Sequence, residues 1–136
     1  MRYLLDVNSL LALGVADHEF HQRMAAWIVG ISASAKPELA TCAITELGFI
    51  RVLGQAQQYG YSVSHARELL MQIKLSELVA WTFVDDDQDV SRMPKWVKTA
   101  KQTTDGHLVG LARAHGAVLA TLDRGIPGAM VIAARA

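Results

Sequence analysis

The chain has 136 residues, of which 51% are hydrophobic and 19% charged, which is typical of one compact domain and excludes a disordered tail. Thirteen basic and thirteen acidic residues give a formal net charge of zero, so global charge does not indicate a nucleic-acid partner. No apolar run is long enough to span a membrane, no export signal is recognisable, and the single cysteine lacks an internal partner, so we expect a cytoplasmic protein with no membrane contact.

The apolar patterning predicts strands that alternate with helices. In chain order we expect a strand over residues 3–7, a helix capped by Asn8-Ser9, a helix behind Asp17, a strand over 39–42, a helix over 44–58, a helix from Ser62 or Ser64 to Leu78, a strand over 79–84, a helix over 105–115, and strands over 117–121 and 130–133. Such alternation implies right-handed crossovers and a parallel sheet covered on both faces. We therefore predict a single domain over residues 1–136, an α/β three-layer sandwich with a mostly parallel central sheet of about four to five strands.

Four acidic residues stand alone at the ends of these segments. Asp6 closes the first strand and Glu46 follows the second, while Asp105 opens the last helix and Asp123 follows the strand over 117–121. Ligands of open parallel α/β folds bind at the carboxyl ends of the strands, so we expect these four side chains at one rim. Two carboxylates about 4 Å apart repel by about 4 kcal/mol at an effective dielectric near 20. The pattern therefore predicts a site for a hard divalent cation, Mg²⁺ or Mn²⁺.

A divalent ion held by carboxylates favours hydrolysis of a phosphate ester, because it neutralises the phosphate and makes a water molecule more acidic. Asn8 and Thr121 lie two residues from Asp6 and Asp123, and we expect them to support the carboxylates. Each residue also has an ordinary explanation when taken singly. Asp105 could stabilise a helix dipole, Asp123 could belong to a turn, and Thr121 could be a plain strand residue.

Basic residues gather before the third acid and beside two of the others. One group recurs every three residues and would form an arc on a helix, either as a solvated face or as an approach for a nucleic acid: Arg92, Lys95, Lys98 and Lys101. Arg51 and Arg124 follow Glu46 and Asp123 closely, so they could contact phosphate or pair with the acids. We predict that all six of these basic residues are candidates for contact with a nucleic acid.

Four stretches carry a pattern that spans nearly the whole chain: LLDVNSLLAL (4–13), TELGFIRV (45–52), TTDGHLVGLA (103–112) and LATLDRG (119–125). Together and in this order they resemble the PIN domain, in particular the VapC-type ribonuclease toxins of bacterial toxin–antitoxin pairs. The resemblance implies that Asp6, Glu46, Asp105 and Asp123 hold Mg²⁺ or Mn²⁺. It also implies an RNA substrate, a homodimer and inhibition by a small VapB-type antitoxin. Gly106 departs from the small apolar residue usual there, and should loosen the helix start by up to about 1 kcal/mol.

The sequence thus predicts a metal-dependent endoribonuclease that acts as the toxin of a toxin–antitoxin pair. One alternative is a phosphatase of the haloacid-dehalogenase type that uses Asp6 as its nucleophile, although that family usually has a second aspartate where Asn8 stands. The other alternative is a non-catalytic module that retains the fold and binds RNA or a protein partner.

Overall fold

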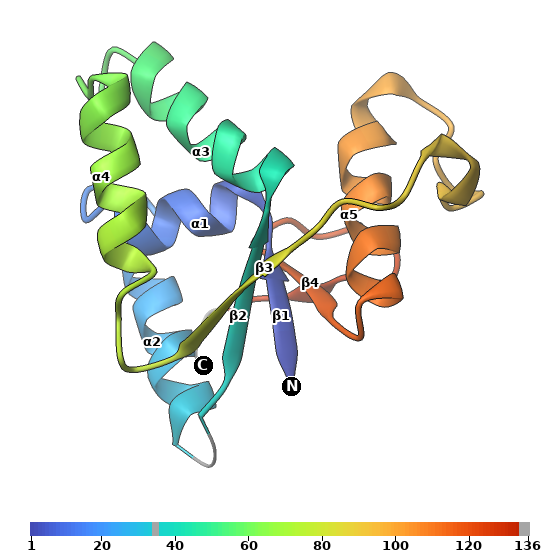
Figure 1. Cartoon of the computed structure of the whole chain (residues 1–136), viewed down its shortest axis with the longest axis horizontal. Coiled ribbons are helices and arrows are strands. Elements are labelled where there is room, and N and C mark those ends of the chain that lie inside the picture. The colour runs from blue at the N-terminus through green and yellow to red at the C-terminus, as the bar shows by residue number, and fades with distance from the viewer. Residues whose placement is uncertain (34–35, 134–136) are drawn as a thin grey trace.

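A computed structural model describes residues 1–33 and 36–133 as strands that alternate with helices (Figure 1). Its elements are β1 (Arg2–Leu5), α1 (Val7–Gly14), α2 (His21–Ser32), β2 (Glu38–Cys42), α3 (Ala43–Gln55), α4 (Val63–Ile73), β3 (Ala80–Val84), the 3₁₀ turns η1 (Val90–Arg92) and η2 (Ala100–Gln102), α5 (Thr103–Ala114), β4 (Val118–Thr121) and β5 (Met130–Val131). Every predicted strand is present, with ends that differ from the prediction by one or two residues.

The strands form one parallel five-stranded sheet in the order β3-β2-β1-β4-β5. β1 is central, because Leu4 pairs with Ala40 of β2 on one side and with Leu119 of β4 on the other. The order of the strands reverses at β1, and ligands of open parallel sheets bind in the crevice at such a reversal. The topology therefore directs attention to the carboxyl ends of β1, β2 and β4.

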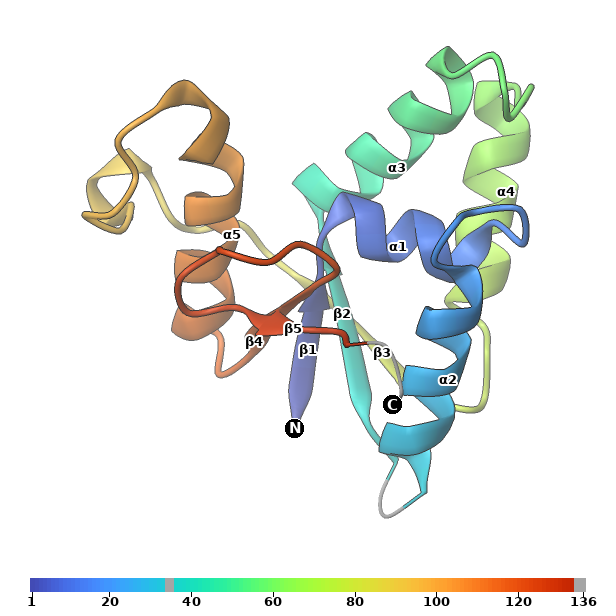
Figure 2. The same cartoon turned by 180° about the vertical axis from the view of Figure 1, so that it is seen from behind.

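Helices cover both faces of the sheet, with α1 to α4 on one side and α5 on the other (Figures 1 and 2). Leu5 of β1 packs into the core beneath α1 to α4, whereas Leu4 packs into the core beneath α5. Successive strand side chains point to opposite faces, and both leucines are fully buried, so β1 contributes to both cores. The predicted three-layer α/β sandwich is confirmed.

The first helix begins earlier than its sequence predicted. α1 starts at Val7, and its N-cap is Asp6 rather than Asn8 or Ser9. The carboxylate of Asp6 accepts a hydrogen bond from the backbone N–H of Ser9 at 2.9 Å. A cap of this kind satisfies an amide that has no partner within the helix. Asp6 is thereby fixed at the junction of β1 and α1.

Two further helices have different bounds from those expected. α2 begins at His21, with Phe20 and not Asp17 as its N-cap. α4 starts behind Ser62, as predicted, but ends at Ile73, so that Leu78 lies outside the helix with 53% of its surface exposed. Within the described residues, no helix combines the length and the apolar character needed to cross a bilayer.

The segment before α5 is not the helix on which a basic arc was expected. It contains only η1 and η2, separated by residues 93–99. Pro94 has no N–H to donate and disfavours a helical backbone at the residue before it, which explains the interruption. The predicted helical arc of Arg92, Lys95, Lys98 and Lys101 is therefore wrong, although all four side chains are exposed.

Candidate active site

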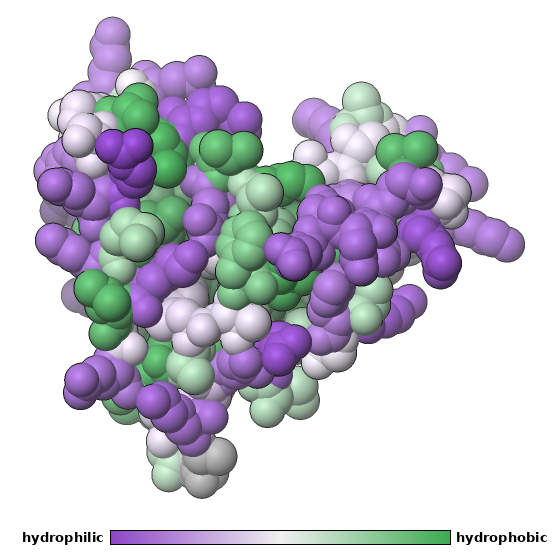
Figure 3. Space-filling view, in the orientation of Figure 1, coloured by the Kyte–Doolittle hydropathy of each residue, from purple (hydrophilic) through white to green (hydrophobic). Residues whose placement is uncertain are grey.

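Three helices begin where the carboxyl ends of the strands meet. α1 follows β1 directly, α3 follows β2 directly, and α5 starts on the opposite side of the sheet (Figure 1). In the space-filling view, a wide notch opens on this edge of the molecule, between α3 and the lobe that precedes α5 (Figure 3). Helix N-termini favour negative charge, so acidic side chains at this rim lie in a favourable field.

The structure places all four predicted acids at this rim. Asp6 is the N-cap of α1, Glu46 lies in the first turn of α3, Asp105 lies in the first turn of α5, and Asp123 lies two residues beyond β4. Four segments distant in sequence thus contribute one acid each to one edge of the sheet.

Asp6 and Asp123 are connected through Thr121. The hydroxyl of Thr121 donates to Asp6 Oδ2 at 2.6 Å and accepts from the backbone N–H of Asp123 at 3.0 Å. Asp6 is only 5% exposed, and its other oxygen accepts from Ser9. Because each oxygen accepts a hydrogen bond, the carboxylate of Asp6 is held in one orientation.

Asp105 is electrostatically coupled to two of the other acids. Burial raises the pKa of the Asp105 carboxyl above its ordinary value, and the negative charges of Asp6 and Asp123 raise this pKa further. The carboxylates of Asp105 and Asp123 accept no hydrogen bond from a side chain or backbone amide elsewhere in the described chain. A bound cation would relieve the repulsion between carboxylates that accept no hydrogen bonds. These carboxylate oxygens therefore suit a hard divalent ion as ligands.

Glu46 is directed elsewhere in this structure. Its Oε2 accepts from the ammonium of Lys74 at 2.6 Å and from the hydroxyl of Thr41 at 2.5 Å. Lys74 is the C-cap of α4, and about a quarter of each side chain of this ion pair is exposed. Over residues 1–33 and 36–133, no three His, Cys, Asp or Glu side chains stand close enough to hold an ion as they are arranged. The carboxylate oxygens are therefore suitable ligands for a metal ion, but in this structure the side chains are not close enough together to surround one.

The remaining predicted site residues make no hydrogen bond or salt bridge to the four acids within the described part of the chain. The amide oxygen of Asn8 is 3.0 Å from His18 Nε2, and no bond joins Asn8 to a site carboxylate. Arg51 and Arg124 are exposed, and neither makes a salt bridge within the described part of the chain. The alternative in which these two arginines pair with the acids is thus not observed, and their guanidinium groups remain available to a phosphate.

A comparison with known protein families matches residues 3–129 to the PIN domain. The chain belongs to the PIN-domain family. Its curated relatives include three ribonucleases of Mycobacterium tuberculosis: VapC44, 39% identical over 93% of this chain and 89% of that protein; VapC38, 34% identical over 90% and 86%; and VapC29, 32% identical over 93% and 89%. The similarity to VapC-type proteins predicted from the four motifs is confirmed.

Two contacts of this PIN domain were not predicted from the sequence. Ser9 was expected as part of the helix cap but instead supplies the amide that fixes Asp6, and an aspartate three residues before that amide is a recognisable capping signal. Lys74 gave no such signal, because it lies 28 residues from Glu46 and meets it only through the packing of α4 against α3. Asp86 and Asp87, which belong to a run of three aspartates after β3, lie outside the site and contact His107 and His115 of the α5 region.

Proposed function

We propose that this chain is a metal-dependent endoribonuclease that hydrolyses RNA phosphodiester bonds as the toxin of a type II toxin–antitoxin system. The observation that carries the proposal is the PIN-domain match over residues 3–129, within which three separate elements bring Asp6, Asp105 and Asp123 to one rim. PIN-domain ribonucleases generally use divalent metal ions, and the relatives of this chain are named as VapC ribonucleases. Mg²⁺ or Mn²⁺ would be the ion, since both prefer oxygen ligands.

In this proposal Asp6, Glu46, Asp105 and Asp123 hold the ion and orient the attacking water. The bound ion supplies charge neutralisation at the phosphate and lowers the pKa of water. Thr121 keeps Asp6 fixed through their 2.6 Å hydrogen bond, as expected of a supporting residue. Glu46 would act either after it separates from Lys74 or through an intervening water, which its longer side chain allows.

The RNA would approach through the notch of Figure 3. Arg124 directly follows Asp123, Arg51 lies five residues after Glu46, and both are exposed, so we propose that they contact phosphates. The lobe before α5 would contribute a second group of exposed cations: Arg92, Lys95, Lys98 and Lys101. Phosphate contacts hold RNA in register without reading its sequence, which suits residues distributed over a loop.

A VapB-type antitoxin and a second copy of the chain are the proposed protein partners, and the cytoplasm is the proposed place of action. Support for protein partners comes from apolar side chains exposed along α3, α4 and the residues after α4. Leu47 is 64% exposed, Val63 60%, Met71 58% and Leu75 77%. Exposed apolar surface of this extent on neighbouring helices is typical of interaction sites.

The phosphatase alternative is disfavoured by the sequence and by the family of the domain. Asn8 stands where that phosphatase family usually has a second aspartate, and residues 3–129 match the PIN domain instead. The non-catalytic alternative does not explain why the carboxylates of Asp105 and Asp123 lie at the rim.

The test is cleavage of a mixed RNA substrate by the purified chain in Mn²⁺, in Mg²⁺ and in EDTA, together with growth arrest on expression. We expect cleavage only with a divalent ion, and at least a hundredfold loss in Asp105→Asn. Asp89→Asn is the matched control, because Asp89 caps η1 outside the site. Equal cleavage by wild type and Asp105→Asn would refute the proposal. Tight RNA binding without cleavage in any divalent ion would favour the non-catalytic module.

A further inference from the structure

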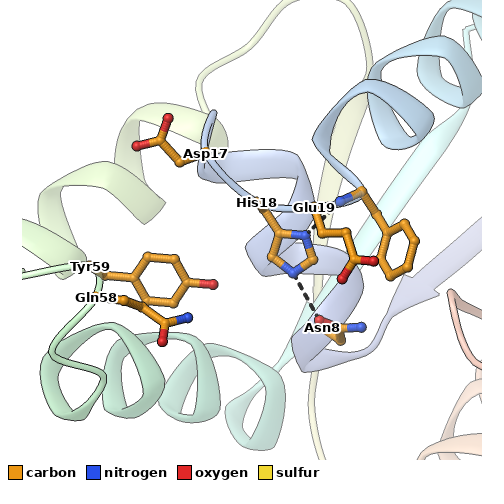
Figure 4. A pocket seen from close by; sticks show the side chains of 7 residues that line it. Asn8, Asp17, His18, Glu19, Gln58 and Tyr59 are labelled. Carbon is orange, nitrogen blue, oxygen red and sulfur yellow. Dashed lines mark hydrogen bonds between the residues drawn. The ribbon is translucent and has the colours of Figure 1, made fainter.

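A polar cavity of about 420 Å³ has Asn8 in its wall (Figure 4). It is built from three separate segments: Asn8 in the first turn of α1, residues 17–20 before α2, and Gln58 and Tyr59 after α3. Its volume is within the range of small-molecule pockets, and it exceeds what a single water would need. None of the functions assigned above uses this cavity.

The cavity is adjacent to the acids because Asn8 is only two residues from Asp6. Two residues span at most about 7 Å of chain, so the Cα atoms of Asp6 and Asn8 are no farther apart than that. A group bound in the cavity therefore lies about one nucleotide from a phosphate held at the acids. A group in the cavity would therefore belong to a neighbouring nucleotide of the RNA strand and not to the phosphate that reacts.

His18 fixes the orientation of Asn8 in the wall of the cavity. The ring nitrogen Nδ1 of His18 accepts from the backbone N–H of Phe20 at 3.0 Å, so the ring proton is on Nε2 and donates to the amide oxygen of Asn8 at 3.0 Å. Burial lowers the pKa of His18, which favours this neutral ring. The NH₂ group of Asn8 has no partner among the described residues. Asn8 is therefore oriented, with two donors unused.

The lining excludes phosphate and suits a flat polar group. Asp17 and Glu19 are its charged residues, and it contains no lysine or arginine, so a phosphate would be repelled. Tyr59 and Gln58 lie across the cavity from His18 and Asn8, and the hydroxyl of Tyr59 points toward His18 (Figure 4). An aromatic ring beside amides and carboxylates is the combination that binds an unpaired RNA base by stacking and by hydrogen bonds to its edge.

We propose that this cavity binds one unpaired base of the RNA, with guanine preferred, next to the cleaved phosphate. The inference rests on the proposed ribonuclease function. Guanine suits the lining because it offers N–H donors to a carboxylate such as that of Glu19, and the acceptors O6 and N7 to the amides of Asn8 and Gln58. Uracil and cytosine offer fewer donors, and adenine lacks the O6 acceptor. The cavity thereby gives the enzyme a means of sequence preference that the phosphate contacts lack.

The first test measures binding without cleavage, so it does not depend on activity. The trinucleotides UGU, UAU, UCU and UUU are titrated in EDTA into ¹⁵N-labelled protein, and amide shifts are followed by NMR. We expect UGU to shift the amides of residues 8, 17–20, 58 and 59, with a Kd about tenfold below that of UUU. Equal affinity for all four trinucleotides, or shifts elsewhere only, would overturn the proposal.

Variants at exposed positions separate base contact from folding. Gln58→Ala and Glu19→Gln should each raise the Kd for UGU about fivefold and reduce the preference over UUU. Gln57→Ala is the matched control, since Gln57 is an exposed glutamine next to Gln58 that does not line the cavity. Identical effects of Gln57→Ala and Gln58→Ala would contradict the assignment.

Cleavage of a random-sequence RNA pool distinguishes this proposal from the proposed function. If the wild type cleaves with guanine enriched at one fixed position, and Gln58→Ala loses the enrichment, both proposals are supported. Cleavage without any base preference would overturn the base site alone, and absence of cleavage with the NMR preference intact would overturn the nuclease alone. If the variants leave RNA unaffected but release a co-purified antitoxin, the cavity instead binds a protein side chain, and the base proposal fails.

Discussion

Replacing Gly106 with alanine should destabilise the protein, although alanine is the better helix former. Gly106 lies in the first turn of α5, directly after Asp105. A Cβ atom at this position would lie 2.2 Å from Cγ2 of Val97 and 3.6 Å from Cη2 of Trp96. The absence of a side chain at residue 106 thus lets the preceding lobe pack closely on the helix that carries the acid.

The expected magnitude is the balance of two terms. Alanine gains about 1 kcal/mol over glycine inside a helix. Overpacking of an added methyl against a branched side chain costs about 1–3 kcal/mol, and the β-branched side chain of Val97 has few alternative rotamers. We therefore expect Gly106→Ala to lose about 1 kcal/mol, or roughly 3–5 °C in Tm for a chain of this size.

Gly110→Ala in the same helix is the matched control. Its Cβ would meet only the backbone oxygen of Arg92 at 3.6 Å and Cδ of Pro94 at 3.9 Å, which are ordinary contacts. This variant should gain up to about 1 kcal/mol. Urea unfolding in EDTA measures both variants without any contribution from a bound ion. If both substitutions stabilise the protein equally, Val97 does not pack on Gly106 as described. If Val97→Ala restores the stability lost in Gly106→Ala, the close contact between residues 97 and 106 is confirmed.

Three further predictions concern the acids. Thr121→Val keeps the shape of a buried residue but removes the donor to Asp6, and should lose about 1.5–3 kcal/mol in urea unfolding, whereas a loss below about 0.5 kcal/mol would contradict that bond. Because the folded state raises the pKa of Asp105 above its ordinary 3.8, it binds that proton more tightly than the unfolded chain does. The metal-free protein should therefore lose stability as pH rises from about 3.8 through the folded pKa, and Asp105→Asn should remove this loss and be the more stable form at neutral pH; an unchanged pH profile of Tm in EDTA would refute the coupling. Lys74→Met removes a cation that competes for Glu46, so Mn²⁺ should bind about fivefold more tightly, and weaker Mn²⁺ binding would show that Lys74 assists the site instead.

The sheet and the positions of the acids could be predicted from the sequence, because each depends on the order of residues along a short segment. Short apolar runs that end in a lone acid place Asp6 and Asp123 after strands, whatever the tertiary packing, and parallel topology then brings the strand ends together. The four family motifs added the identity of the domain, and the comparison confirmed it.

The remaining features depend on contacts that no local pattern encodes. Glu46 meets Lys74 only because α4 returns along α3, and the cavity at Asn8 needs three segments to come together. The basic arc failed for a local reason that was visible, since Pro94 interrupts any helix through residues 92–101. Asp6 was expected as a ligand alone, yet it also caps α1, because a strand and a helix join there without an intervening turn.

The most direct test of the account is the binding of Mn²⁺ to the purified protein, measured by calorimetry and by electron paramagnetic resonance. We predict a binding site in the wild type that is weakened at least tenfold in Asp105→Asn and unchanged in Asp89→Asn, because only Asp105 shares its surroundings with Asp6 and Asp123. Equal Mn²⁺ affinity in the wild type and in Asp105→Asn would show that the acids at the rim do not form one metal site.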